Sequence, residues 1–240
     1  MSKTLRSIGK WAEISLLTPL WLTPGLAATW LSQEWGQALT QHWARTLLRR
    51  LGITVETCDP GGFLHTGERC IFVHLNQSSL LEALLWAAIV PRRMGRVLNI
   101  EFALLPFIGW TLAAQDGFVI RRQSPGQAKA RLQQAVDYVR SGGNLILSIE
   151  GRRSEDGSLS PYKKGPVVMA IEAGATLVPL TTHGLRECLP FGAWRIAPGH
   201  AKVVVHEPIE TRGLGYEDRD ELVARLRTIA EEALADGRRE

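Results

Sequence analysis

Cysteine is scarce in this chain, whose 240 residues include only Cys58, Cys70 and Cys188. Their number is odd and their spacing fits neither a metal site nor a redox pair. This argues against a disulfide framework and favours reduced thiols in a protein that faces the cytosol. The sequence also lacks a P-loop, a dinucleotide-binding fingerprint and a cluster of residues with metal-ligand spacing. We therefore expect no metal and no nucleotide cofactor.

Interdomain linkers, internal repeats and low-complexity tracts are also missing from the sequence. With 45% hydrophobic residues, a chain of this length can bury one sizeable core, so a single folded unit is expected. The formal net charge of +4 favours anionic partners. Aromatic residues interleaved with lysine and arginine on a strand are lacking, so we do not expect a nucleic acid among these partners.

Charge is absent from the segment between Ile14 and Ser32, which three basic residues precede. At about 1.5 Å per residue, a helix of this length nearly crosses the hydrocarbon core of a bilayer. Pro19 and Pro24 predict that this helix breaks into two short pieces. We expect residues 1–52 to form a re-entrant or interfacial pair of membrane-associated helices; a cleaved signal peptide and a plain soluble helix pair are the alternatives. Tryptophans that suit the head-group boundary gather here, at Trp11, Trp21, Trp30, Trp35 and Trp43.

Residues 53–240 alternate short aliphatic runs with amphipathic segments, which predicts an α/β domain. A helix with apolar residues at every fourth position precedes this domain and ends at Gly52. We expect strands over residues 53–58, 70–75 and 201–206, the last being the final strand, and helices that end near residue 89 and span residues 217–235.

The aliphatic run from Leu145 to Ile149 ends abruptly in the charged loop Glu150-Gly151-Arg152-Arg153-Ser154. In open α/β sheets, ligands bind beyond the carboxyl ends of the strands, so this loop is a candidate site. Guanidinium groups bind phosphate oxygens through two parallel hydrogen bonds, and two adjacent arginines therefore indicate a phosphorylated ligand. A solvated turn between two elements is the alternative explanation.

Four motifs follow one another along the chain, and their order is more specific than any one of them. They are Asn76-Gln77-Ser78-Ser79-Leu80-Leu81-Glu82; Gly117-Phe118-Val119-Ile120-Arg121-Arg122, preceded by Pro106-Phe107-Ile108-Gly109-Trp110; Glu150-Gly151-Arg152-Arg153-Ser154, followed by Lys164-Gly165; and Val178-Pro179. In this order the motifs resemble those of the glycerophospholipid acyltransferase family, whose members include 1-acyl-sn-glycerol-3-phosphate acyltransferases. The resemblance covers about residues 48–180.

The resemblance implies a single acyltransferase domain with a central mixed β-sheet flanked by helices. It implies transfer of a fatty acyl group from acyl-CoA or acyl carrier protein to the hydroxyl of a lysophospholipid such as 1-acyl-glycerol-3-phosphate, without a further cofactor. Membrane lipids would be partners of a peripheral or monotopic protein at the inner face of the cytoplasmic membrane. The family's second and third motifs hold the acceptor's phosphate, and the matching positions here are Arg122, Glu150, Gly151, Arg152, Arg153 and Ser154.

The first motif departs from the family pattern at both of its catalytic positions. Gln77 stands where the family has the histidine that removes the hydroxyl proton, and Glu82 stands where it has the aspartate that orients this histidine. A glutamine amide cannot accept a proton near neutral pH, so Gln77 cannot be the base. His74, at the end of the preceding strand, is the obvious replacement, although a histidine there is also explained as a core residue. Glu82 also completes a capping box with Ser79, which is a purely structural role.

Two functions from different classes remain open. The first is an active acyltransferase that uses a relocated base or a substrate that needs little base catalysis; His183 and His200 are weaker candidates for this base than His74. The second is a non-catalytic lipid-binding relative that has kept the fold and the anion site but lost the His/Asp pair. The carboxylate of Glu82 favours the enzyme. The acceptor could be a lysophospholipid, an ornithine- or sugar-based lipid, or an unrelated alcohol.

Overall fold

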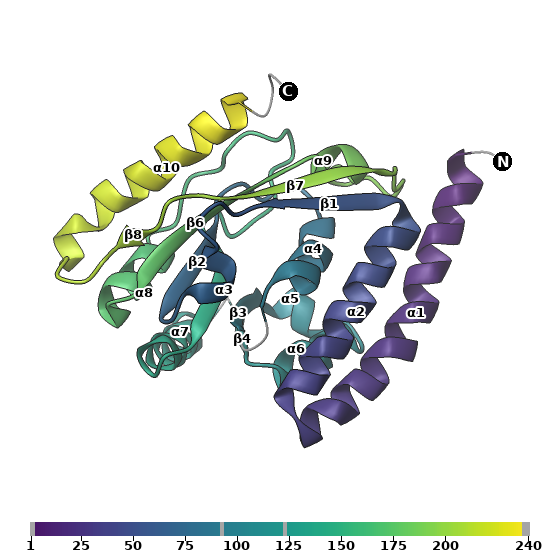
Figure 1. Cartoon of the computed structure of the whole chain (residues 1–240), viewed down its shortest axis with the longest axis horizontal. Helices are drawn as coiled ribbons and strands as arrows, with labels where there is room; N and C mark the ends of the chain where they lie inside the picture. The colour runs from purple at the N-terminus through teal and green to yellow at the C-terminus, as the bar shows by residue number, and fades with distance from the viewer. Residues whose placement is uncertain (1–2, 92–93, 122–123, 237–240) are drawn as a thin grey trace.

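The computed structural model describes residues 3–91, 94–121 and 124–236. Its centre is a mixed β-sheet in the strand order β1-β7-β6-β2-β5-β3-β4, and β8 pairs with β6 (Figure 1). The neighbours from β6 to β4 are parallel, β7 is antiparallel to β6, and β1 is parallel to β7. The strands are β1 (Ile53–Cys58), β2 (Cys70–His74), β3 (Met94–Asn99), β4 (Gly117–Ile120), β5 (Asn144–Ser148), β6 (Thr176–His183), β7 (Gly199–Val205) and β8 (Ile209–Glu210).

Helices cover both faces of this sheet, with α7, α8 and α10 on one side and α1, α2, α4, α5 and α6 on the other (Figure 1). The predicted fold class, a mixed sheet flanked by helices, is therefore confirmed. The helices are α1 (Lys3–Leu31), α2 (Gln33–Leu51), α3 (Phe63–Thr66), α4 (Leu81–Ile89), α5 (Ile100–Ala103), α6 (Ile108–Ala114), α7 (Pro125–Arg140), α8 (Gly165–Ala173), α9 (Leu185–Cys188) and α10 (Arg219–Asp236), with the 3-10 turn η1 (Tyr216–Asp218) before α10.

Strand β2 lies in the middle of the sheet and is buried along its whole length. Ile71 and Val73 pack into the apolar cluster beneath α7, α8 and α10, whereas Phe72 packs on the opposite face. This alternation follows from the two-residue period of a strand, and burial on both faces explains the continuous apolar run. The register pairs His74 with Ser148 of β5 and with Leu180 of β6. The loops after β2, β5 and β6 therefore leave the sheet at the same edge.

The N-terminal region is a helical hairpin of α1 and α2, in which α1 is one continuous helix containing Pro19 and Pro24. The prediction that these prolines divide it into two short pieces is wrong. Packing against α2, where Leu22 is buried beside Trp43 and Leu47, outweighs a cost of about 3 kcal/mol for each interior proline.

Helix α1 is also, among the described residues, the one helix long and apolar enough to cross a membrane, from Thr4 to Leu31. Core helices of soluble proteins share this length and composition, but only 22% of its most apolar window is buried. Its exposed side carries a stripe of large apolar residues, namely Leu5, Ile8, Leu16, Leu20, Trp30 and Leu31.

Most other expected elements are confirmed, including β1 and the end of α2, where Gly52 adopts a left-handed conformation with φ of 76°. Residues 201–206 overlap β7, but they are not the final strand, because the two-residue β8 follows and pairs with β6. A strand of two residues is too short to produce a recognisable pattern in the sequence.

Candidate active site

The loop after β2 is fastened to β6 through the side chain of Asn76. Its amide nitrogen donates to the backbone oxygen of Thr182 at 2.7 Å, and its amide oxygen accepts from the backbone nitrogen of Thr182 at 2.9 Å. The side chain thus provides the two hydrogen bonds that a strand residue would make, at the point where β2 leaves the sheet. The first motif is therefore held against the strand that carries the fourth.

Glu82, in the first turn of α4, is 1% exposed. Its Oε1 accepts hydrogen bonds from the backbone nitrogens of Ser78 at 2.7 Å and Ser79 at 3.1 Å, and from the Ser78 hydroxyl at 3.1 Å. The carboxyl group therefore does close the turn before α4, as a capping residue does. Burial nevertheless raises the pKa of Glu82 to about 8. Oε2 has no hydrogen-bond partner in the described part of the chain.

His74 lies against this carboxyl group, with its Nδ1 3.9 Å from Oε2 of Glu82. Its Nε2 is 3.1 Å from the hydroxyl of Thr182, and its ring meets the Trp86 ring edge-on at 4.9 Å between centroids. The residue is 2% exposed, and burial lowers the pKa of His74 to about 3. His74 is thus neutral at pH 7 and lies close to Glu82, but an acceptor hydroxyl cannot touch it in this conformation.

Gln77 occupies the position of the family histidine and is half-buried. Its backbone nitrogen donates to Oε2 of Glu150, and its backbone oxygen accepts from the nitrogen of Ser154 at 2.7 Å. No partner for its side-chain amide is found within the described ranges. This amide can donate and accept hydrogen bonds at the site, although it cannot take a proton.

The third motif contacts the loop of the first motif through Glu150. Both carboxylate oxygens of Glu150 accept backbone hydrogen bonds, one from Gln77 and one from Ser160 at 2.5 Å. Burial raises the pKa of Glu150, while these bonds and the nearby Arg227 guanidinium act in the opposite direction. Gly151 allows the chain to turn because its φ is 70°, a conformation that side chains disfavour. Glu150 therefore links the third motif to the backbone of Gln77.

The predicted phosphate-binding residues do not all point the same way. Arg152 is exposed, and Arg153 is half-buried with its guanidinium carbon 5.0 Å from the centre of the Phe191 ring. The Ser154 hydroxyl accepts from the nitrogen of Gly157 at 2.9 Å and donates to Asp156, so it stabilises the following turn. Ser154 thus serves the turn, and Arg153 is packed against an aromatic ring, whereas Arg152 lies in solvent.

Some predicted residues lie elsewhere, and Arg122 lies outside the described residues. His183 ends β6, whereas His200 lies on the outer strand pair, where it contacts Glu56 at 3.1 Å and Thr54 at 3.0 Å. The assignments of bases and phosphate ligands stay predictions. No group of three potential metal ligands occurs in the described part of the chain.

Sequence reasoning missed Thr182 and Arg227. Thr182 lies three residues beyond the fourth motif's proline, and its hydroxyl faces His74. Arg227, on α10, donates to the backbone oxygens of Ser160 at 2.9 Å and Leu159 at 3.3 Å. It thereby holds the segment whose amide binds Glu150. A helix of alternating charges carries no local signal for such a contact.

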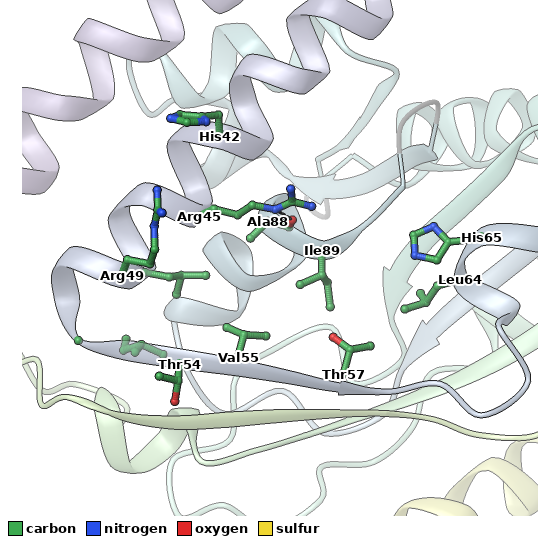
Figure 2. Close-up of a pocket in the computed structure, with 13 residues that line it drawn as sticks. His42, Arg45, Arg49, Thr54, Val55, Thr57, Leu64, His65, Ala88 and Ile89 are labelled. Carbon is green, nitrogen blue, oxygen red and sulfur yellow. Dashed lines mark hydrogen bonds between the residues drawn. The ribbon is translucent and has the colours of Figure 1, made fainter.

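A groove of about 880 Å³ lies between α2, α3, β1 and the end of α4 (Figure 2). None of the predicted site residues lines it. Arg45 points across it and donates to the backbone oxygen of Ala88 at 2.8 Å, and Arg49 lies in the last turn of α2. Both arginines therefore stabilise helix C-termini, where carbonyl groups attract cations.

Comparison with known proteins agrees with this geometry. The family model described as Acyltransferase matches residues 62–183. The chloroplast 1-acyl-sn-glycerol-3-phosphate acyltransferase of Brassica napus is 32% identical over 107 residues, which cover 44% of this chain and 31% of the relative. The 1-acyl-sn-glycerol-3-phosphate acyltransferase of Pseudomonas aeruginosa is 26% identical over 168 residues, which cover 70% of this chain and 64% of the relative. The matched regions thus span between about a third and two thirds of these relatives.

A solved structure extends the likeness to the whole fold. The crystal structure of the 1-acyl-sn-glycerophosphate acyltransferase PlsC from Thermotoga maritima superimposes with a TM-score of 0.83 over 98% of this chain and 97% of that chain, at 18% sequence identity. At this identity the likeness shows a shared fold. The family model covers just over half of the residues, including the first, third and fourth motifs, whose loops contact one another at the carboxyl ends of the central strands. The chain therefore belongs to the acyltransferase family.

Proposed function

We propose that the chain transfers a fatty acyl group from a thioester donor, acyl-CoA or acyl carrier protein, to the hydroxyl of a lysophospholipid such as 1-acyl-glycerol-3-phosphate. The observation that carries this proposal is the junction of the two motif loops, where Glu150 binds the backbone nitrogen of Gln77, and the nitrogen of Ser154, next to Arg153, binds the backbone oxygen of Gln77. Family membership and the names of the relatives support the same reaction. The protein acts at a membrane, peripheral or monotopic, at the inner face of the cytoplasmic membrane.

In this reaction the acceptor oxygen bonds to the thioester carbonyl carbon, the carbon–sulfur bond breaks, and the hydroxyl proton ends on the thiol. Arg153 binds the acceptor's phosphate, and the Gln77 amide orients its hydroxyl by hydrogen bonding. His74 is the base that we propose for this proton, and it requires an opening of the packing around Trp86 to reach the hydroxyl. A substrate that needs little base catalysis removes this requirement.

The alternative is a lipid-binding relative without catalysis. Two observations favour it: Gln77 replaces the family base, and His74 is 2% exposed with its pKa lowered to about 3. A group with so low a pKa is a weak base near neutral pH.

Transfer assays with lysophosphatidic acid in vesicles separate the two functions. Acyl-CoA and acyl carrier protein thioesters of several chain lengths are supplied in turn, and product formation is followed by mass spectrometry. Formation of phosphatidic acid above the level of a reaction without the protein supports the enzyme. Binding of lysophosphatidic acid without transfer from any donor supports the alternative.

A further inference from the structure

The loop that follows α9, residues 189–196, lies outside every motif and outside the region matched by the family model. It is exposed except at Leu189 and Ile196. Phe191 is 41% exposed and Trp194 is 45% exposed, so two large aromatic side chains stand in solvent on one short loop. Aromatic side chains exposed together mark a binding surface more often than single exposed residues do.

This loop is tied to the first motif and to α1. The Ser79 hydroxyl donates to the backbone oxygen of Leu189 at 2.8 Å. From α1, the Trp11 indole nitrogen donates to the backbone oxygen of Trp194 at 2.7 Å, and the Lys10 amine donates to that of Ile196 at 3.3 Å. The loop therefore lies between the candidate active site and the helix that is apolar enough to enter a membrane.

The third motif reaches the same loop through Arg153, whose guanidinium lies over the Phe191 ring at 5.0 Å. Among the described residues, Arg153 pairs with no carboxylate, so its hydrogen-bond donors stay available for an anion. The ring holds the guanidinium by a cation–π contact without using these donors. An apolar surface and an anion ligand are thus side by side at the edge of the sheet.

We propose that Phe191 and Trp194 form the lipid-facing wall of the acceptor site, a conclusion that rests on the proposed function and deepens it. Phe191 contacts the apolar part of an anionic single-chain lipid whose phosphate binds Arg153. Trp194 lies in the head-group region beside α1, where an indole has both apolar surroundings and water within reach. The acceptor therefore reaches Arg153 from the bilayer without crossing bulk water.

The test compares Phe191→Ala and Trp194→Ala with Tyr216→Ala in the full chain. Tyr216 is a matched control, because it is 62% exposed, lies 4.0 Å beneath the Arg219 guanidinium and belongs to η1, far along the chain from every motif. We expect Phe191→Ala to raise the KM for 1-acyl-glycerol-3-phosphate in vesicles by about 3- to 10-fold, with an unchanged KM for the thioester donor. Phe191→Leu keeps the apolar contact and should recover part of this loss.

Partition into phosphatidylcholine vesicles, with and without lysophosphatidic acid, is measured for the same variants. We expect Trp194→Ala to weaken partition by about 3- to 10-fold, and Phe191→Ala to reduce the gain that lysophosphatidic acid produces. If both variants match Tyr216→Ala, or if they change the oligomeric state and not partition, the inference is wrong. A changed donor KM would also overturn it, because the loop would then serve the donor.

Partition requires no turnover, so the inference and the proposed function can fail separately. If the wild-type chain transfers no acyl group, while Phe191→Ala and Trp194→Ala bind lipid more weakly than the wild type, the proposed function is contradicted and the lipid-facing wall is supported. A wild-type chain that transfers acyl groups, with both variants equal to the control, contradicts the wall alone.

Discussion

His74 and Glu82 lie side by side in the interior, and burial moves their pKa values in opposite directions, to about 3 and about 8. Near pH 7 the imidazole of His74 is therefore neutral, and the carboxyl group of Glu82 is harder to ionise than that of an exposed glutamate. A neutral imidazole can accept a proton, but one with this pKa does so poorly until water or substrate reaches it. The hydroxyl of Thr182, 3.1 Å from Nε2, fixes the orientation of the ring.

The relocated-base hypothesis concerns turnover. If His74 is the base, His74→Ala should lower kcat by about 10² to 10⁴ with a nearly unchanged acceptor KM, because a positioned base acts in the transition state. Gln77→Ala should have a smaller effect, and Gln77→His should raise activity by restoring the family residue. His200→Ala, at an exposed position on β7, is the control. Unchanged turnover in His74→Ala together with no gain in Gln77→His would reject the hypothesis.

The shifted pKa values of His74 and Glu82 predict how the unfolding free energy depends on pH. The pKa of His74 falls from 6.5 to about 3 in the folded state, so its contribution is present above pH 6.5 and is lost as the pH falls toward 3. The pKa of Glu82 rises from 4.5 to about 8, so its contribution is present below pH 4.5 and is lost as the pH rises toward 8. Each group changes the unfolding free energy by at most about 1.4 kcal/mol per pH unit, and the two slopes oppose each other where the windows overlap, between pH 4.5 and 6.5.

Urea unfolding across the pH range measures both slopes. His74→Gln should flatten the loss of unfolding free energy on the acid side, and Glu82→Gln should flatten the loss on the neutral-to-alkaline side. Slopes equal to those of the wild type in both variants would show that the two groups titrate in the folded protein as they do in the unfolded chain.

Among the elements, α10 is the one whose role differs most from its sequence pattern. The pattern predicts a structural surface helix, and its buried residues Leu222 and Leu226 do pack into the core. Its Arg227 also holds the backbone of Leu159 and Ser160, and Ser160 in turn binds Glu150. A helix beyond the family-matched region thus supports the loop that positions Gln77.

Replacing Arg227 should therefore affect catalysis as well as stability. We expect Arg227→Met to reduce kcat by about 3- to 10-fold and to lower the unfolding free energy by about 1 kcal/mol, since two charge-assisted hydrogen bonds from a half-buried group are lost. Arg227→Lys should restore part of the kcat. Arg225, exposed on the same helix, provides the control Arg225→Met. A drop in stability with full kcat would mean that Arg227 is a structural residue only.

Over the whole molecule, the α1–α2 hairpin combines a buried side with an apolar exposed side. Leu22 fills the core with Trp43, whereas Leu16 and Leu20 are 71% and 66% exposed. The helix therefore stabilises the domain with one side and leaves an apolar side exposed, which we propose contacts a lipid surface. The continuous helix, in place of the two expected pieces, makes this exposed stripe longer.

The double change Leu16→Ser and Leu20→Ser should separate these two roles. Because both side chains are exposed, the midpoint of unfolding should stay within experimental error, while vesicle partition should fall by about 10- to 100-fold. Co-sedimentation with vesicles measures this partition, and Leu214→Ser, at an exposed site near η1, is the control. Equal partition of the double variant and the control would favour a helix pair that does not enter lipid.

Several strands and the order of motifs are local properties, and the sequence alone predicts them. β2 and β5 appear as short apolar runs, Gly52 marks the end of α2, and the motif loops follow strands whose carboxyl ends share one edge. These features arise from side-chain periodicity and backbone preference over a few neighbouring residues. The sequence also makes His74 and Glu82 candidates for one site, since eight positions separate them across one strand-to-helix turn, but their contact is a property of the folded structure.

Other parts of the site depend on contacts between distant positions, and only the tertiary structure decides them. Thr182 reaches His74 across 108 residues, Arg227 reaches Ser160 across 67, and Trp11 reaches the loop at Trp194 across 183. Sheet order and helix packing bring these groups together, and no local pattern encodes them. Burial likewise belongs to the assembled core: it raises the pKa of Glu82 and makes His74 a weak base, because both side chains are desolvated only after β2, β6 and α4 have packed.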